Sequence, residues 1–145
     1  MSQSKVSRRL AEAIAPEVIE HVYRPRLAGE MLAVFPYLSA LNMAHLAMLA
    51  ERRILTPAQA SAVAGGLLRI EAEGAEAITP DPLLEDTYFN VEARLIGLVG
   101  ADAGGRLHIG RSRNDLSAAL DRMRARDALL SLLEGVNGLR AVLLE

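Results

Sequence analysis

The last part of the sequence, from about Asn114 to Glu145, contains no proline and repeats its apolar residues regularly. Intervals of three and four residues alternate between Leu129, Leu132, Val136, Leu139 and Leu143. This spacing is typical of a helix that packs lengthwise against other helices. A helix of roughly 30 residues is about 45 Å long, which exceeds the expected diameter of a domain of this size. We therefore expect the chain to be the front part of something larger, with neighbours from other subunits or from further sequence.

Composition favours an all-α fold. Apolar residues make up 51% of the 145 residues and aromatic residues only 3%. Leucine and alanine, both strong helix formers, are the most frequent residues, so an all-β sandwich or barrel is hard to build from this sequence. The chain has no cysteine, which excludes a disulfide scaffold, a cysteine-ligated zinc site and a cysteine nucleophile.

Charge and hydropathy exclude further classes of partner. The net charge is −2, so bulk electrostatics do not indicate a nucleic-acid binder. We expect no uncharged apolar window of about 18 residues, and therefore no membrane span. The first twenty residues carry acidic residues within their apolar stretch and do not resemble a secretory signal. The three histidines lack metal-ligand spacing. We expect a cytoplasmic protein without a metal or other cofactor.

Prolines and capping residues predict the helix boundaries. We expect a short amphipathic stretch at Val6–Ile14, a short helix at Pro16–Val22, a break at Pro25, and a largely buried helix from Pro36 to Arg53. Thr56, Pro57 and Gln59 then form a capping-box start for a helix that ends near Gly74. A further helix is expected at Glu85–Val99, followed by a glycine-containing loop at Gly100–Gly110.

One segment carries residues suited to chemistry, and it runs from Leu107 to Asp115 with the sequence LHIGRSRND. It leads from a glycine-containing loop into the long C-terminal helix, whose first N–H groups and partial positive charge attract anions. Arg111 and Arg113 add planar donors for carboxylates, and Ser112 and Asn114 add neutral donors. The residue types alone indicate a site for a small carboxylate.

A purely structural interpretation stands beside that one. Ser112 or Asn114 can be the N-cap of the helix, and Asp115 can be a first-turn acid that matches the helix dipole. The arginines can be solvated or paired with helix carboxylates. His108 is more simply explained by a hydrogen bond within the loop, and His45 by a satisfied position in the core or at an interface.

The run LHIGRSRND closely resembles the LHTGRSRND segment of the argininosuccinate lyases, within the fumarase and aspartase superfamily. Other matches follow the same order. The EDTY and VEARL segments resemble EDIH and VEARL, the PY and AHLAML segments resemble PYD and AHARML, and ILT resembles GILT. Together these matches span roughly Pro36 to Arg122.

This resemblance implies a small N-terminal helical domain, here residues 1–111, that leads into a central helical bundle, here beginning with residues 112–145. In the family, four subunits pool their bundles and three subunits contribute to each active site, so a homotetramer is implied. The family reaction, part of arginine biosynthesis, is a reversible β-elimination that releases fumarate from an N-substituted succinate and uses no cofactor. By resemblance, Ser112, Arg113 and Asn114 would bind the substrate carboxylates. The family's catalytic serine loop and its Thr-His pair are outside this chain, so we expect no catalytic residue here and no turnover by these residues alone.

Several positions depart from the family pattern. Leu38 and Asn42 replace an aspartate and a serine, Tyr88 replaces a histidine, Ile109 a threonine and Leu116 a glutamine. Several of these positions line the amino-acid half of the family's site, and we count Asn42 and Tyr88 among the candidate substrate-binding residues. The changes suggest a lyase that acts on another aminopolycarboxylate. The alternatives are a non-catalytic helical scaffold or partner subunit of the same fold and, more remotely, an unrelated helical anion-binding module.

Overall fold

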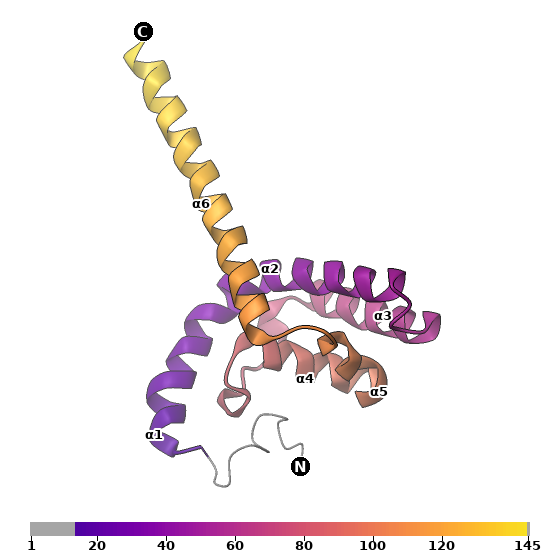
Figure 1. Cartoon of the computed structure of the whole chain (residues 1–145). Coiled ribbons are helices and arrows are strands. Elements are labelled where there is room, and N and C mark those ends of the chain that lie inside the picture. Colours follow the sequence, from indigo (N-terminus) through magenta and orange to yellow (C-terminus); the bar gives the residue numbers. More distant parts are fainter. Residues whose placement is uncertain (1–13, 145) are drawn as a thin grey trace. The chain divides into compact units, whose positions relative to one another are not determined.

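The computed structural model describes residues 14–144, and every regular element in that range is helical. The predicted all-α fold is confirmed. The chain divides into two compact units, residues 1–109 and 110–145, which are described separately below (Figure 1). Most of the expected stretch Val6–Ile14 lies outside the described residues. The assignment of residues 112–145 to a bundle domain stays a prediction.

The first unit opens with one continuous helical run made of α1 (Pro16–Val18), the π-helical segment η2 (Ile19–Tyr23) and α2 (Arg24–Glu51). The predicted break at Pro25 is therefore wrong. The backbone N–H of Arg24 bonds to the carbonyl of Ile19, five residues back, so the turn is one residue wider than an α-helical turn. We attribute the continuation through Pro25 to this wide turn, which gives the proline ring room next to the preceding carbonyls.

The predicted helix start at Pro36 is also wrong, because Pro36 lies inside α2. Its missing N–H leaves one bond of the helix unmade, and its ring crowds the carbonyl of Leu32. The run changes direction on its way from α1 into the second half of α2 (Figure 1), as expected where a proline interrupts the hydrogen-bond ladder. Phe35 and Leu38, on either side of the proline, are buried, and this packing offsets the cost.

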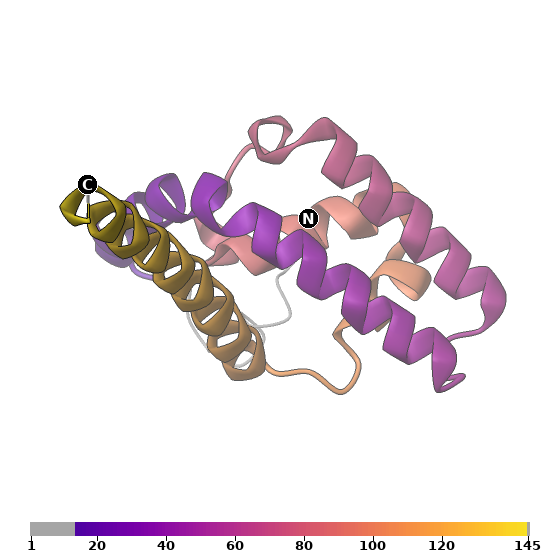
Figure 2. The same cartoon turned by 90° about the horizontal axis from the view of Figure 1, so that it is seen from above.

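By length and composition alone, the run Pro16–Glu51 is apolar enough to cross a membrane, a test that core helices of soluble proteins also pass. The expectation that no such stretch exists is therefore wrong, because residues 31–50 of this run contain no Asp, Glu, Lys or Arg. Its buried face packs in the first unit, where α2 contacts α3 (Pro57–Glu73) and α4 (Thr87–Val99). Figures 1 and 2 show α2 and α3 side by side.

Helix α3 begins and ends as the sequence predicts. The Thr56 hydroxyl accepts the Gln59 N–H at 3.3 Å, and the Gln59 side chain accepts the Thr56 N–H at 3.1 Å. Gly74 ends the helix with a φ of 77°, a conformation that favours glycine. The capping signals in the sequence therefore fix both ends of this helix.

The middle of α3 packs closely against α4 at Gly66. A β-carbon added at Gly66 would lie 2.6 Å from Leu95 Cδ1 and 2.7 Å from Val99 Cγ1. Glycine therefore allows the two helices to approach each other. The core of the first unit is otherwise mostly aliphatic, and its most deeply buried apolar side chains are Leu27, Leu38, Leu49, Val63, Leu95 and Leu107.

The connection into α4 contains two short 3-10 segments, η3 (Ala75–Ala77) and η4 (Pro82–Leu84). Asn90 fastens this connection, because its amide nitrogen donates to the Asp81 carbonyl at 3.2 Å and its amide oxygen accepts the Asp81 N–H at 2.7 Å. Asp86 caps α4 by accepting the Phe89 N–H at 2.9 Å. Glu85, where the sequence placed the helix start, has a φ of 69° and precedes the helix.

The glycine-containing stretch after α4 is more regular than predicted. It forms α5 (Ala101–Gly104) and the 3-10 segment η5 (Gly105–His108). Gly104 packs against Ile96, whose α-carbon would lie 3.0 Å from an added β-carbon. Leu107 is 2% exposed. Gly104 thus serves close packing, whereas Gly100 has a φ of 84° and no atom within 4 Å of an added β-carbon.

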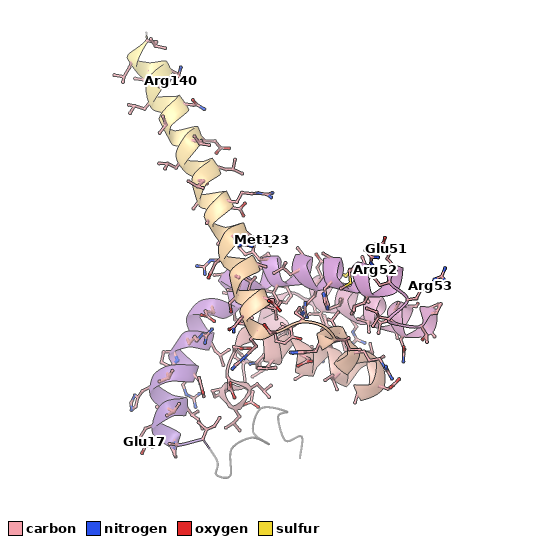
Figure 3. The ribbon with its side chains drawn as sticks, viewed as in Figure 1. Glu17, Glu51, Arg52, Arg53, Met123 and Arg140 are labelled. Atoms are coloured by element: carbon pink, nitrogen blue, oxygen red, sulfur yellow. The ribbon has the colours of Figure 1, made fainter. Side chains whose placement is uncertain are left out.

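The second unit consists of α6 (Arg113–Leu143), a single helix of 31 residues. Its extent agrees with the helix predicted from Asn114 onward. Side chains project from it along its length, from Met123 past Arg140 (Figure 3). The predicted apolar series is exposed: Leu129, Leu132, Val136, Leu139 and Leu143 retain between 46% and 75% of their accessible surface.

Candidate functional site

The candidate carboxylate site lies at the beginning of α6. Ser112 is the N-cap, and Arg113 and Asn114 are the first two residues of the helix. All three side chains are exposed. The first turn of a helix carries N–H groups without intrahelical partners and a partial positive charge. One turn thus presents a hydroxyl, a guanidinium and an amide around a position that favours an anion.

Ser112 and Asp115 form a capping box, so the structural interpretation of these two residues is confirmed. The Ser112 hydroxyl accepts the Asp115 N–H at 3.3 Å, and the Asp115 carboxylate accepts the Ser112 N–H at 2.9 Å. The backbone N–H of Ser112, with its hydroxyl as a smaller cause, holds the pKa of Asp115 below its ordinary value of 3.8. Asn114, the other candidate N-cap, is not the cap.

The cap does not exclude a second role for Ser112. A hydroxyl carries one donor and two acceptor lone pairs. The capping bond uses the hydroxyl as an acceptor, so a ligand carboxylate that accepts the O–H would leave this bond intact and would compete only with the smaller contribution of the hydroxyl to Asp115. The two interpretations of the segment are therefore compatible at this residue.

The other two candidate substrate-binding residues lie in the first unit and are buried. Asn42, in α2, is 1% exposed, and Tyr88, in α4, is 6% exposed. Both form interactions with other residues, as expected of buried polar groups. Their contact with a substrate stays a prediction.

Tyr88 belongs to a cluster that sequence reasoning missed. Its hydroxyl lies 2.7 Å from Nδ1 of His108, and Oε1 of the buried Glu92 lies 3.6 Å from the same nitrogen. The Phe89 ring is parallel to the His108 imidazole, with 6.4 Å between ring centroids. The available signal was the spacing of Tyr88 and Glu92, which are four residues apart and hence share a helix face.

The two histidines of the first unit near this segment are hydrogen-bonded, as predicted. His108 bonds to Tyr88, and Nε2 of His45 lies 3.0 Å from the carbonyl oxygen of Ile109. A carbonyl only accepts hydrogen bonds, so His45 carries a proton on Nε2. His45 thus has a structural partner in the residue after His108.

Two carboxylates of the first unit, the half-buried Glu73 and the exposed Asp102, are held in their ionised form by arginines. Arg94 Nη2 lies 2.6 Å from Glu73 Oε2 and, with Arg69 as a second cause, holds the pKa of Glu73 below its ordinary value. Arg106, with Gln59 as a second cause, does the same for the pKa of Asp102. The ion pair of Glu73 with Arg94 joins α3 to α4 and thereby stabilises their packing. Within residues 14–144, no group of three histidine or acidic side chains is arranged to hold a metal ion.

Comparison with known proteins gives a family context. No family model matches the chain. It is 38% identical to argininosuccinate lyase 1 of Shouchella clausii over 137 residues, which are 94% of this chain and 28% of that protein. It is 44% identical to the argininosuccinate lyase of Methanosarcina acetivorans over 104 residues, which are 72% of this chain and 21% of that protein. The chain is a homologue of the argininosuccinate lyases.

The argininosuccinate lyase of Synechococcus sp. is also similar, with 41% identity over 128 residues, or 83% of this chain and 26% of that protein. The chain spans about a quarter of the length of the curated relatives it matches. It corresponds to their N-terminal part. The family resemblance found in the short motifs thus extends over most of the chain.

Proposed function

We propose that this chain is part of a carbon–nitrogen lyase that removes an amine from an N-substituted succinate and releases fumarate. The observation that carries the proposal is the exposed Ser112, Arg113 and Asn114 set at the start of α6, in a chain homologous to argininosuccinate lyases over most of its length.

The reaction needs a base for the Cβ proton, donors for the resulting aci-carboxylate, and an acid for the leaving nitrogen. Arg113 suits the second task because its planar guanidinium binds a carboxylate through two parallel bonds. Ser112 and Asn114 donate single hydrogen bonds that orient the carboxylate. We assign substrate binding to these residues and place the base and the acid in parts of the enzyme outside this chain.

We further propose that the leaving amine differs from that of the argininosuccinate lyases. Leu38 is 1% exposed and Tyr88 is 6% exposed, and Leu116 is 4% exposed in the second unit. Where the family motif has polar side chains at these positions, this chain buries an apolar or aromatic one. A buried polar group without a hydrogen-bond partner costs about 1–3 kcal/mol. A guanidino group would lack such partners in a pocket altered in this way, so the pocket disfavours it. Another aminopolycarboxylate is the substrate class we favour.

The exposed apolar series of α6 supports an assembly. Five leucine and valine side chains at helical spacing, Leu129 to Leu143, are each at least 46% exposed, and contiguous exposed apolar surface marks association sites. We propose a homotetramer of cytoplasmic subunits, without nucleic-acid or membrane partners. Sedimentation of the chain over a range of concentrations tests this, and a monomer at all concentrations would contradict it.

The intact mass of the protein from its natural source is the first measurement. A mass about three times the 15.6 kDa of this chain would agree with the length of the relatives. The protein of natural length is then assayed for fumarate release from argininosuccinate and from aminopolycarboxylates that carry a succinate group. We expect release from an aminopolycarboxylate. Turnover of argininosuccinate at ordinary rates would contradict the altered leaving group, and no fumarate from any substrate would favour the non-catalytic scaffold.

Arg113→Lys tests the site itself. An ammonium cannot reproduce the two parallel bonds of a guanidinium, and we expect kcat/KM to fall on the order of 100-fold, as when one transition-state donor is removed. Arg126→Lys, at another exposed position of α6, is the matched control and should retain activity. Equal activity of the two variants would remove Arg113 from the site.

A further inference from the structure

The segment between η5 and α6 contains little regular structure of its own. Gly110 has a φ of 73°, and the backbone bond of Ile109 N–H to Arg106 O at 3.0 Å is the last one before the capping box of Ser112. A glycine in this conformation is permissive and does not by itself define a path for the chain. Side chains that bind this part of the chain therefore contribute to its order.

Two helices of the first unit supply side chains to His108, the last residue of η5, and to Ile109, the residue that follows it. Tyr88 of α4 bonds through its hydroxyl to Nδ1 of His108 at 2.7 Å. His45 of α2 donates through Nε2 to the carbonyl oxygen of Ile109 at 3.0 Å. The two contacts join residues 20 and 64 positions apart in the sequence, so local helix geometry does not explain them.

Neighbouring groups fix the position of His108 further. Leu107, the preceding residue, is 2% exposed, and the Tyr88 and Phe89 rings lie 5.4 Å and 6.4 Å from the imidazole, between centroids. Tyr88 is itself buried, so its hydroxyl needs a hydrogen-bond partner, and the imidazole provides one.

We infer that His45 and Tyr88 are positioning residues that hold His108 and Ile109, the last two residues of the first unit, and thereby fix the point from which the chain continues to Ser112. The inference deepens the proposed function, on which its activity readout rests. Tyr88 acts in this way through His108, and direct contact with a substrate is not required.

We call the hydrogen bonds His45–Ile109 and Tyr88–His108 the two anchors. Asparagine and glutamine substitutions at His45 and at His108 should affect the two anchors in opposite ways. A glutamine amide reaches about as far as Nε2 of histidine, and an asparagine amide about as far as Nδ1. His45 uses Nε2 and His108 uses Nδ1. His45→Gln and His108→Asn should therefore keep their anchors, whereas His45→Asn and His108→Gln should lose them.

Amide hydrogen exchange of the full chain tests the anchors without any ligand. We expect the Ile109 amide to exchange about three- to ten-fold faster in His45→Asn, His108→Gln and Tyr88→Phe, which is the factor expected for the loss of one hydrogen bond. His45→Gln and His108→Asn should exchange at the original rate. The Ser112 amide, bonded within the capping box, should not change in any of them. His21→Asn and Tyr23→Phe, at other positions of the first unit, are the matched controls.

The activity readout follows in the protein of natural length. Loss of an anchor should raise KM about three- to ten-fold with a smaller change in kcat, and the two reach-preserving variants should restore the original KM. Unchanged Ile109 exchange in His45→Asn, His108→Gln and Tyr88→Phe would overturn the anchors. Faster exchange with unchanged KM would overturn their link to the site, and an inactive natural-length protein with the expected exchange pattern would overturn the proposed function alone.

Discussion

The two units of the chain use leucine in opposite ways. In the first unit, Leu49 and Leu95 have no exposed surface and Leu27 and Leu38 have 1%. In the second unit, Leu132 and Leu139 are 62% and 60% exposed. Apolar side chains at helical spacing thus form a closed core in one unit and an uncovered series in the other.

The difference shows that the helical spacing of apolar residues predicts a face that other groups cover, but does not identify those groups. In the first unit, short connections bring α3 and α4 back onto α2, so the partners of each apolar face come from the same chain. The α6 helix has no such connection after it within the described residues. The same sequence signal therefore corresponds to a closed core before Gly110 and to an uncovered apolar face in the described residues after it.

The largest effect is expected from truncating one leucine of each kind. Leu95→Ala leaves a cavity in the core and should lower the free energy of unfolding by about 2–5 kcal/mol at every protein concentration. Leu132→Ala should change it by about 0.5 kcal/mol or less in dilute monomer, with an effect that grows with concentration. Urea denaturation at several concentrations measures both. If both variants lost the same free energy of unfolding at every concentration, the proposed difference between the two units would be wrong.

A second test concerns two adjacent glycines of α3. An alanine at Gly66 meets Leu95 and Val99, whereas nothing lies within 4 Å of a β-carbon at Gly65. Gly66→Ala should cost about 1–3 kcal/mol through overpacking. Gly65→Ala should stabilise the helix by roughly 0.5–1 kcal/mol. Thermal denaturation of the two variants distinguishes the effect of close packing from the effect of helix propensity. A stabilising Gly66→Ala would show that α3 and α4 are not in close contact at this position.

A third test compares the two capping boxes. Replacing a capping threonine or serine by alanine costs about 1 kcal/mol. Thr56→Ala should lower the stability of the whole first unit, because α3 packs in its core. Ser112→Ala should chiefly increase fraying of the first turn of α6, seen as faster exchange of the Asp115 amide. Ser112→Thr keeps the cap and serves as the control. A loss of first-unit stability in Ser112→Ala would contradict this division.

The smallest effect is expected from acid. Arg94 lowers the pKa of Glu73, and the Ser112 N–H lowers that of Asp115, from ordinary values of 4.5 and 3.8. Since both folded-state pKa values are depressed, each carboxylate contributes stability above its ordinary value and loses it as pH falls through the folded value. Carboxylate NMR titration should show both midpoints below the ordinary values. Glu73→Gln and Asp115→Asn should each reduce the acid sensitivity of their own unit, and a normal midpoint for either would contradict its bond.

Much of the fold follows from local signals in the sequence. Thr56, Pro57 and Gln59 predict the start of α3, Gly74 predicts its end, and the run after Asn114 predicts α6. The two errors in the long first helix fall at prolines. Pro25 and Pro36 read as boundaries because proline lacks an N–H, but a wide turn before the first and core packing around the second carry the helix through both.

The candidate site is predictable only in part. The motif predicts that Ser112, Arg113 and Asn114 share a helix start, because the capping chemistry is local. The bonds of Tyr88 to His108 and of His45 to Ile109 join distant segments, and no local spacing specifies which residues meet. Such contacts depend on how α2, α4 and η5 pack, which a single sequence does not encode in any short pattern.

The π-helical segment at Ile19–Tyr23 has a consequence for the history and engineering of this chain. One turn there holds one residue more than an α-helical turn, as an insertion into an ordinary helix would leave it. Deleting a single residue from this segment would restore the α-helical register and rotate α1 (Pro16–Val18) by about 100° around the helix axis. Residues after Arg24 would keep their faces toward the core. The segment thus sets the direction in which the side chains of α1 point, without any change to the faces that α2 presents to the core.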